Sequence, residues 1–334
     1  MSDSRPDGGQ PLGEDIFTRT SDVPEPSLGD RLRRFVDSVF LAPMRVAWED
    51  IRMQIGMTVI AGLVLMGTVG PLVVETPTVL EAPPYTPWFQ NMAVPLGTDK
   101  LGMALHKQLI HATPAMLKMI FAGAFISVIL GTVIGCMAGY KGGTVDRALM
   151  AITDTILTIP GLALILVVTA IYRPQSSIVV GLILGIDNWP GLARSIRSEV
   201  LSIREESYTE ASRVMGLSQW HIFRKDIASS LMPFISINFA NSSRGIIFES
   251  VGLYFIGILP YTNSNWGIML NEAYQTGDAT EHIYWILVPL LTIVLASLGF
   301  ILFAQGLDRV FNVRLRARYE KTSEDAESGP VPGE

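Results

Sequence analysis

Long apolar runs, each about as long as a bilayer is thick, constrain this chain more than any other feature. A membrane-spanning helix needs about 20 predominantly apolar residues, and the chain offers several such stretches. Composition agrees, because 49% of the 334 residues are hydrophobic. We therefore expect an all-α membrane protein with six transmembrane helices, at about residues 54–74, 114–138, 147–171, 175–193, 233–258 and 283–305.

The distribution of Lys and Arg sets the expected orientation, because basic residues favour cytoplasmic loops. They precede the first span, mark the turn at 141–147, fill the 194–232 segment and follow the sixth span, whereas 259–282 contains none. Lys100 and Lys107 are the exceptions. The pattern predicts a multi-pass cell-membrane protein (plasma or inner membrane) with both termini in the cytoplasm.

The remaining organisation follows from local composition. Residues 1–27 predict a disordered acidic tail. Residues 28–53 have apolar positions at helical spacing opposite basic ones, which indicates a cytoplasmic amphipathic helix, lying either on the inner membrane surface or on the protein itself. The first span and an external segment occupy 54–113, a helical core occupies 114–310, and 311–334 forms a cytoplasmic tail.

Two features of the spans predict local structure. Gly131, Gly135 and Gly139 form small-xxx-small pairs, which allow another helix backbone to approach closely. The third span is interrupted at Ile159-Pro160-Gly161. The single cysteine, Cys136, lies in an apolar run and excludes a disulfide within the chain.

The segment between the fourth and fifth spans is polar and predicts a helical hairpin. Ser207 and Glu210 fit a capping box at the start of a short helix, and Gly216 can end that helix in the left-handed conformation. Ser218 can then cap a second helix. The segment is either a docking element for a cytoplasmic partner or an ordinary linker.

Short motifs between residues 97 and 310 make the function more specific. They are G-T-D-x-x-G at 97–102, G-Y-K-G-G-x-x-D at 139–146, Asp154 with Ile159-Pro160, W-P-G-x-A-R at 189–194 with Arg197, Glu205, Tyr208, E-A at 210–211 with Gly216, F-E-S at 248–250 with Gly257, W-G at 266–267, and G-L-D-R at 306–309. In this order and spacing they resemble the permease subunits of oligopeptide, dipeptide and nickel ABC importers, of the second-permease (C-type) subfamily. Ser212, Ser229 and Arg244 depart from that family's pattern.

The resemblance implies a type I ABC importer permease core of five helices plus an N-terminal helix, with the hairpin as a coupling helix at 207–217. The implied partners are a second homologous permease, two ATP-binding cassette subunits, an extracytoplasmic solute-binding protein and membrane lipid. ATP and magnesium then belong to the cassette subunits, and this chain holds no cofactor. The residues expected to couple it to the ATPase are Glu210, Ala211, Ser212, Arg213, Gly216 and Leu217.

Charged residues inside spans are costly and mark either function or a buried ion pair. Asp154, Asp187, Arg244 and Glu249 are therefore candidates for the translocation path or its gate, and Arg244 could pair with Glu249 or Asp154. On the external side, three aromatic residues are candidates for docking the binding protein: Trp88, Tyr261 and Trp266.

Several function classes are disfavoured. No G-x-x-x-x-G-K-[ST] phosphate loop is present, so we expect this chain not to hydrolyse ATP itself, and no catalytic or metal-ligand constellation appears. The net charge of −6 argues against nucleic acid as a partner. The expected solute is an oligopeptide or dipeptide, with nickel chelates or oligosaccharides as alternatives. The competing class is an ATP-independent channel or secondary transporter, although no inverted repeat is visible; a membrane scaffold is a third.

Overall fold

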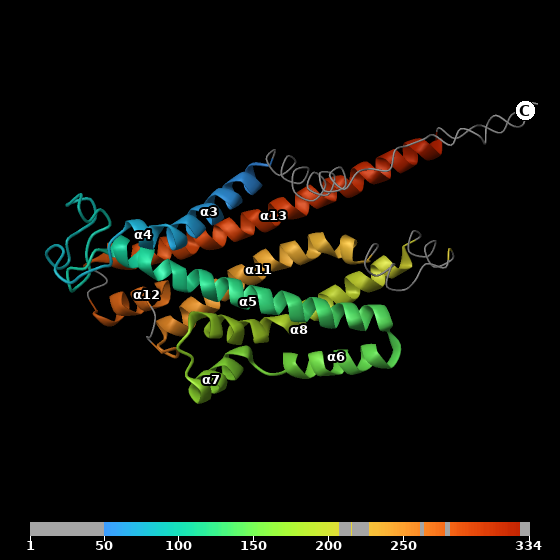
Figure 1. Ribbon diagram of the computed structural model, residues 1–334, viewed down its shortest axis with the longest axis horizontal. Helices are drawn as coiled ribbons and strands as arrows, with labels where there is room; N and C mark the ends of the chain where they lie inside the picture. Colours follow the sequence, from blue (N-terminus) through green and yellow to red (C-terminus); the bar gives the residue numbers. More distant parts are fainter. Residues whose placement is uncertain (1–49, 207–214, 216–226, 261–263, 278–280, 328–334) are drawn as a thin grey trace, which may run out of the picture. The chain divides into compact units, whose positions relative to one another are not determined.

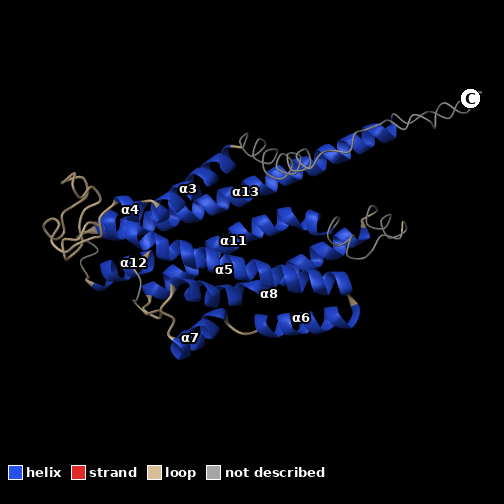
Figure 2. Cartoon of the chain, viewed as in Figure 1, coloured by secondary structure: helices blue, strands red, loops and turns tan. Residues whose placement is uncertain are grey.

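The computed structural model describes residues 50–206, 215, 227–260, 264–277 and 281–327. Within these ranges the chain is helical, with loops between the helices and one isolated antiparallel bridge between Thr98 and Ala104 (Figure 2). The predicted tail 1–27, most of the predicted helix 28–53 and all residues of the predicted coupling helix 207–217 except Met215 lie outside the described residues.

Helix α3 (Ile51–Thr68) packs along α13 (Ile283–Glu327) (Figure 1). Asp50 caps α3 by accepting a hydrogen bond from the Arg52 N–H at 2.8 Å, and its other oxygen accepts one from Arg309 at 2.9 Å. At the end of α3 a short helix, α4 (Gly70–Val73), follows with a proline in its first turn. Asp50 therefore links the N-terminus of α3 to Arg309 in the second half of α13.

Helices α5 (Leu105–Lys141) and α8 (Ser177–Glu205) share the most extensive contact between any two helices in the described part of the chain. The glycines of α5 provide the space: a Cβ added at Gly135 would lie 2.5 Å from the Ala193 carbonyl oxygen, and one at Gly139 would lie 2.9 Å from the Val200 side chain. Ser127 also donates a hydrogen bond to the Gly185 carbonyl at 2.8 Å. The predicted close approach at the small-xxx-small pairs is confirmed.

The third predicted span is a broken helix. Helix α6 (Gly143–Leu157) and helix α7 (Gly161–Tyr172) meet at an angle of 81°. Pro160 occupies the N-cap position of α7, where its lack of an N–H does no harm. The interruption predicted at Ile159-Pro160-Gly161 is thus confirmed, and both halves contact α8.

Helix α11 (Ala228–Phe255) contacts α5, α8, α12 and α13. The short helix α12 (Trp266–Gln275) was not predicted from the sequence. Asn265 caps it by accepting from the Ile268 N–H at 3.0 Å, and most of its apolar side chains are buried. An asparagine directly before an apolar cluster is an N-cap signal, so the sequence contained the information.

Each of the six predicted spans corresponds to helix in the structure, but length and hydropathy together identify fewer spans. Among the described residues, three helices qualify as candidate spans, or four if the bent α6–α7 pair is counted as one. α8 and α11 do not qualify, since polar residues interrupt their apolar sequence. Six spans therefore remain a prediction.

Two helix boundaries differ from the sequence-based ones. The predicted span 175–193 ends at a Trp-Pro-Gly motif, yet α8 continues through Pro190 to Glu205, because a single proline bends or weakens a helix without always ending it. The predicted span 283–305 is continued by α13 to Glu327. Residues 307–327 contain no Gly or Pro, so nothing in this sequence stops the helix.

Candidate functional site

The segment between α4 and α5 is organised around Thr98 and Asp99, the polar residues of the G-T-D-x-x-G motif. The Asp99 carboxylate accepts from the N–H groups of Leu101 and Met103, at 2.8 and 2.9 Å, and from the Gln108 amide at 2.8 Å. Thr98 accepts from the Thr86 N–H at 2.9 Å and donates to a proline carbonyl. Both residues are almost fully buried, so the motif builds the turn that leads into α5, as predicted.

The two glycines of this motif are required by the backbone. Gly97 and Gly102 have φ angles of +84° and +71°, which side chains rarely tolerate. A Cβ at Gly97 would also lie 2.6 Å from the Thr86 carbonyl oxygen. The glycines therefore allow the backbone at 97–102 to approach the backbone at 82–86 closely.

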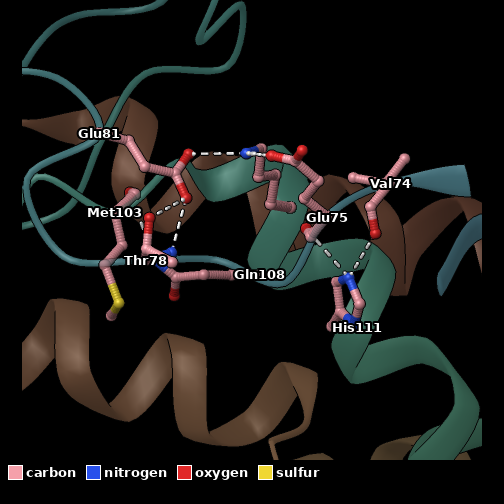
Figure 3. A network of polar contacts seen from close by, with 8 residues as sticks. Val74, Glu75, Thr78, Glu81, Met103, Gln108 and His111 are labelled. Atoms are coloured by element: carbon pink, nitrogen blue, oxygen red, sulfur yellow. Dashed lines mark hydrogen bonds and ion pairs between the residues drawn. The ribbon is translucent and has the colours of Figure 1, made fainter.

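A polar network fastens the same segment to α5 (Figure 3). Lys107 lies 3.2 Å from Glu81 and 3.6 Å from Glu75, and a ring nitrogen of His111 lies 2.9 Å from the Val74 carbonyl oxygen. Burial opposes ionisation of Glu81, but hydrogen bonds from Thr78 and the Lys107 ammonium outweigh it and lower the pKa of Glu81. Through these contacts, Lys107 and His111 of α5 hold residues 74–81 against the start of the helix.

At the other end of α5 an apolar cluster joins three helices. It comprises buried residues of α5, of α8 and of the residues that follow the undescribed 216–226 segment: Val128, Cys136, Leu192, Ile196, Val200, Ile203, Ile227 and Leu231. Ile203 precedes the 207–226 region and Ile227 follows it. Both ends of that region are thus anchored in one packed core, which we call the basal cluster.

Arginines of α8 reinforce this end of the molecule. Arg204 donates to the carbonyl oxygens of Gly139 and Tyr140, at 2.8 and 3.2 Å, where cationic groups complement the carbonyl-rich end of α5. Arg197 makes a bidentate contact with Asp146 of α6, with Nη2 2.6 Å from Oδ2. The A-R-x-x-R pattern at 193–197 therefore fixes α8 against its neighbours.

Three of the four predicted intramembrane charges find contacts within the chain. Asp154 pairs with Arg194, and both side chains are more than half exposed. Glu249 accepts hydrogen bonds from the Asn188 amide at 3.1 and 3.0 Å. The carboxylate of Asp187 lies against Gly161, at the start of α7, where the helix dipole favours negative charge.

The fourth predicted charge, Arg244, has no such contact. No ion pair or hydrogen bond joins it to another described residue, and its Nε is buried without a partner. Its suggested pairing with Glu249 or Asp154 is not found among the described residues, because these carboxylates contact Asn188 and Arg194 instead.

The docking candidates differ in exposure. Trp88 is partly exposed beside Phe89 on the 75–104 segment. Trp266 is fully buried, and its indole N–H donates to the Thr113 hydroxyl at 3.3 Å, so it packs α12 against α5. Tyr261 lies outside the described residues.

Sequence reasoning missed two residues of the site, Asn188 and Arg204. Asn188 precedes the W-P motif, and its contact with Glu249 spans 61 positions, so no local pattern reveals it. Arg204 was counted only as a basic loop residue. A basic residue near a helix C-terminus signals contact with carbonyl oxygens of its own helix, but Arg204 of α8 contacts those of α5, which no local pattern predicts.

Comparisons with known proteins agree with this architecture. A family profile described as a binding-protein-dependent transport system inner membrane component matches residues 131–317. The dipeptide transport system permease protein DppC of Bacillus subtilis (strain 168) is 26% identical over 304 residues, which cover 86% of this chain and 92% of the relative. The oligopeptide transport system permease protein OppC of Lactococcus lactis subsp. cremoris (strain SK11) is 30% identical over 226 residues, 67% of this chain and 76% of the relative.

Among solved structures, a chain of the MetNI methionine ABC transporter in an inward-facing conformation matches with a TM-score of 0.50 and 20% identity. The match covers 62% of this chain and 96% of that chain. At this identity the likeness establishes a shared fold.

Proposed function

The chain belongs to the family of binding-protein-dependent transport system inner membrane components, and from this we propose that it forms one half of a solute path driven by separate ATPases. It is a permease of the ABC-importer class, hence a transport subunit in a membrane. We propose that a second homologous permease completes the path, that two ATP-binding cassette subunits bind ATP and magnesium, and that an extracytoplasmic binding protein delivers the solute.

The observation that carries the coupling proposal is the basal cluster. Because Ile203 and Ile227 are buried in one core with α5, a force applied to residues 207–226 reaches α8 and α11 together. Arg204 adds a polar link from α8 to the end of α5. We propose that the cassette subunits grip Glu210, Ala211, Ser212, Arg213, Gly216 and Leu217 and so move both helices.

The proposed topology keeps both termini in the cytoplasm and the 75–113 and 259–282 segments outside. This places the basal cluster at the cytoplasmic end and Trp88 at the external end, as a contact for the binding protein. The basic residues around the basal cluster support this orientation, since such residues favour the cytoplasmic side.

The proposed solute is a dipeptide or oligopeptide, because the relatives DppC and OppC are named as dipeptide and oligopeptide permeases. Nickel chelates or oligosaccharides are the alternative cargo for the same machine. An ATP-independent channel is the competing class. The anchoring of residues 207–226 at both ends favours an ATP-driven mechanism instead, because a channel needs no segment through which a partner subunit transmits force.

The test is solute-stimulated ATP hydrolysis by the chain reconstituted with its partner subunits. Gly216→Arg places a long charged side chain where the cassette subunit is proposed to approach, so stimulation is expected to disappear. Gly216→Ala is the matched control and is expected to retain most of the stimulation. Stimulation that survives Gly216→Arg, with the subunits still copurifying, would refute the coupling proposal.

A further inference from the structure

One face of α11 is exposed along much of the helix, and its end nearest Phe255 borders α12 and α13. Asn241 and Gly252 are exposed, Phe248 is 52% exposed, and a Cβ added at Gly245 or Gly252 would meet nothing within 4 Å. These four positions follow at spacings of four, three and four residues, so they form one stripe along the helix. We call this stripe the open face of α11.

The open face is bordered by opposite charges. Helical geometry turns the chain about 100° per residue, so Arg244 and Glu249, five positions apart, point about 140° from each other on opposite edges of the stripe. Glu249 is on the edge beside α8, where Asn188 holds it. Arg244 is on the other edge, seven and eleven residues before Val251 and Phe255.

Val251 and Phe255 show what lies along the Arg244 edge. Together with Phe248 and Gly252 of the open face, they line an apolar groove of about 380 Å³ whose other wall is formed by α12 and α13. The groove carries no charged side chain, and α8 with its carboxylates lies on the opposite edge. No ion pair joins Arg244 to another described residue, and its Nε is buried without a partner.

Such an arginine needs a partner from outside the described chain. A charged side chain in the middle of a membrane helix costs about 2.5–3.5 kcal/mol or more. Arg244 lies 16 residues from the start of α11 and 11 from its end, about 24 and 16 Å along the axis. Arg244 therefore lies in the middle part of the helix, away from both ends.

We propose that the open face of α11 is a wall of the solute path, and that Arg244 binds an anionic group of the passing solute, such as a carboxylate. The inference rests on the proposed transport function. A planar guanidinium with unused donors suits a carboxylate, which it can bind through two parallel hydrogen bonds. Asn241, one helical turn away, adds a polar group to the same wall, where lipid would favour apolar side chains.

The first test probes the wall without any transported solute. In a Cys136→Ala background, Asn241→Cys in the assembled transporter is exposed to a negatively charged (sulfonatoethyl) and a positively charged (trimethylammonioethyl) methanethiosulfonate. Labelling of Cys at 241 is expected, and Arg244→Gln is expected to lower the ratio of anionic to cationic labelling about threefold or more.

The control is Ile246→Cys on the fully buried side of α11, which is expected to stay unlabelled. Absence of labelling at position 241 would show that lipid or a partner covers this face, which overturns the wall. A labelling ratio that does not change with Arg244→Gln overturns the anion site.

The second test measures selectivity in proteoliposomes that contain the assembled transporter and its binding protein. The probes are trialanine and its C-terminal amide, which lacks the carboxylate. Arg244→Gln is expected to reduce trialanine uptake about tenfold or more, to reduce uptake of the amide much less, and to be partly rescued by Arg244→Lys.

Equal losses for both peptides would contradict recognition of the carboxylate by Arg244. If the wild-type transporter takes up neither peptide with ATP, the proposed cargo fails instead, whereas the labelling test still decides the anion site.

Discussion

The seam between α5 and α8 makes the sharpest quantitative prediction, at Gly135. A Cβ at this position would lie 2.5 Å from the Ala193 carbonyl oxygen and 2.9 Å from the Cβ of Ile196. Ordinary contacts begin at 3.4 Å, so Gly135→Ala forces the two helices apart by roughly 1 Å, since neither backbone nor Cβ can rotate away. Overpacking of this kind costs about 1–3 kcal/mol.

Gly191 supplies the matched control. It lies on α8, two residues from Ala193, and a Cβ there meets nothing within 4 Å. Replacing a helical glycine by alanine gains about 1 kcal/mol of helix propensity at either site. The difference between Gly135→Ala and Gly191→Ala therefore isolates the steric cost at the seam.

The assay is thermal unfolding of the purified transporter in detergent, which is monitored by the loss of the monodisperse species. Gly135→Ala is expected to melt several degrees below Gly191→Ala, at about 2–4 °C for each kcal/mol. Gly191→Ala is expected to melt at or above the wild-type temperature. Equal melting temperatures for the two variants would refute the argument that backbone proximity at Gly135 holds the seam together.

Two further predictions concern the 75–104 segment. Asp99→Ala leaves two backbone N–H groups without their acceptor in a buried turn and removes one of the two acceptors of the Gln108 amide, so a loss of about 2–4 kcal/mol is expected. Alanine at the exposed Glu75 is expected to change the melting temperature by less than about a degree, and similar shifts for both variants would contradict the turn's role. Because the pKa of Glu81 is lowered in the folded state, its ionised form stabilises the fold above its ordinary pKa, and this contribution is lost as pH falls through the folded pKa. Glu81→Gln is therefore expected to melt below wild type at pH 7. The difference is expected to shrink as the pH falls below 4.5, the ordinary pKa of a glutamate, and a difference that does not change with pH would contradict the ion pair.

The sequence predicted those features that depend on local chemistry. Helix positions followed from apolar runs, the break before α7 from Pro160, and the turn before α5 from Gly97 and Gly102. The close approach of a second helix to Gly135 was also predictable, because small residues at four-residue spacing have few other uses in a membrane helix. In each case the determining residues lie within one or two helical turns of each other.

Features set by register between distant helices were not predictable. Whether Glu249 meets Asn188 or Arg244 depends on how α11 is rotated against α8, and a change of one residue turns a helix by about 100°. The same holds for Asp154, which contacts Arg194 across 40 positions. Trp266 was expected among the exposed docking candidates, yet its burial depends on the cap at Asn265 that creates α12. Trp88 and the intramembrane charges keep their proposed roles.

α8 is packed differently at the basal cluster and near Asn188, and this difference indicates which part of the chain would move under an applied force. At the basal cluster, apolar side chains and Arg204 join α8, α11 and α5 into one packed unit, and packed cores shift between discrete arrangements instead of deforming gradually. Farther along, the polar link between α8 and α11 is the Asn188–Glu249 contact, beside the open face. If ATP-driven force enters at 207–226, the basal unit moves as a body, and the change in separation falls on the stretch that contains Glu249 and Arg244. A change in the width of the path at this stretch would alter how closely Glu249 and Arg244 approach the solute, so the proposed driving force and the proposed binding wall meet at the same part of α11.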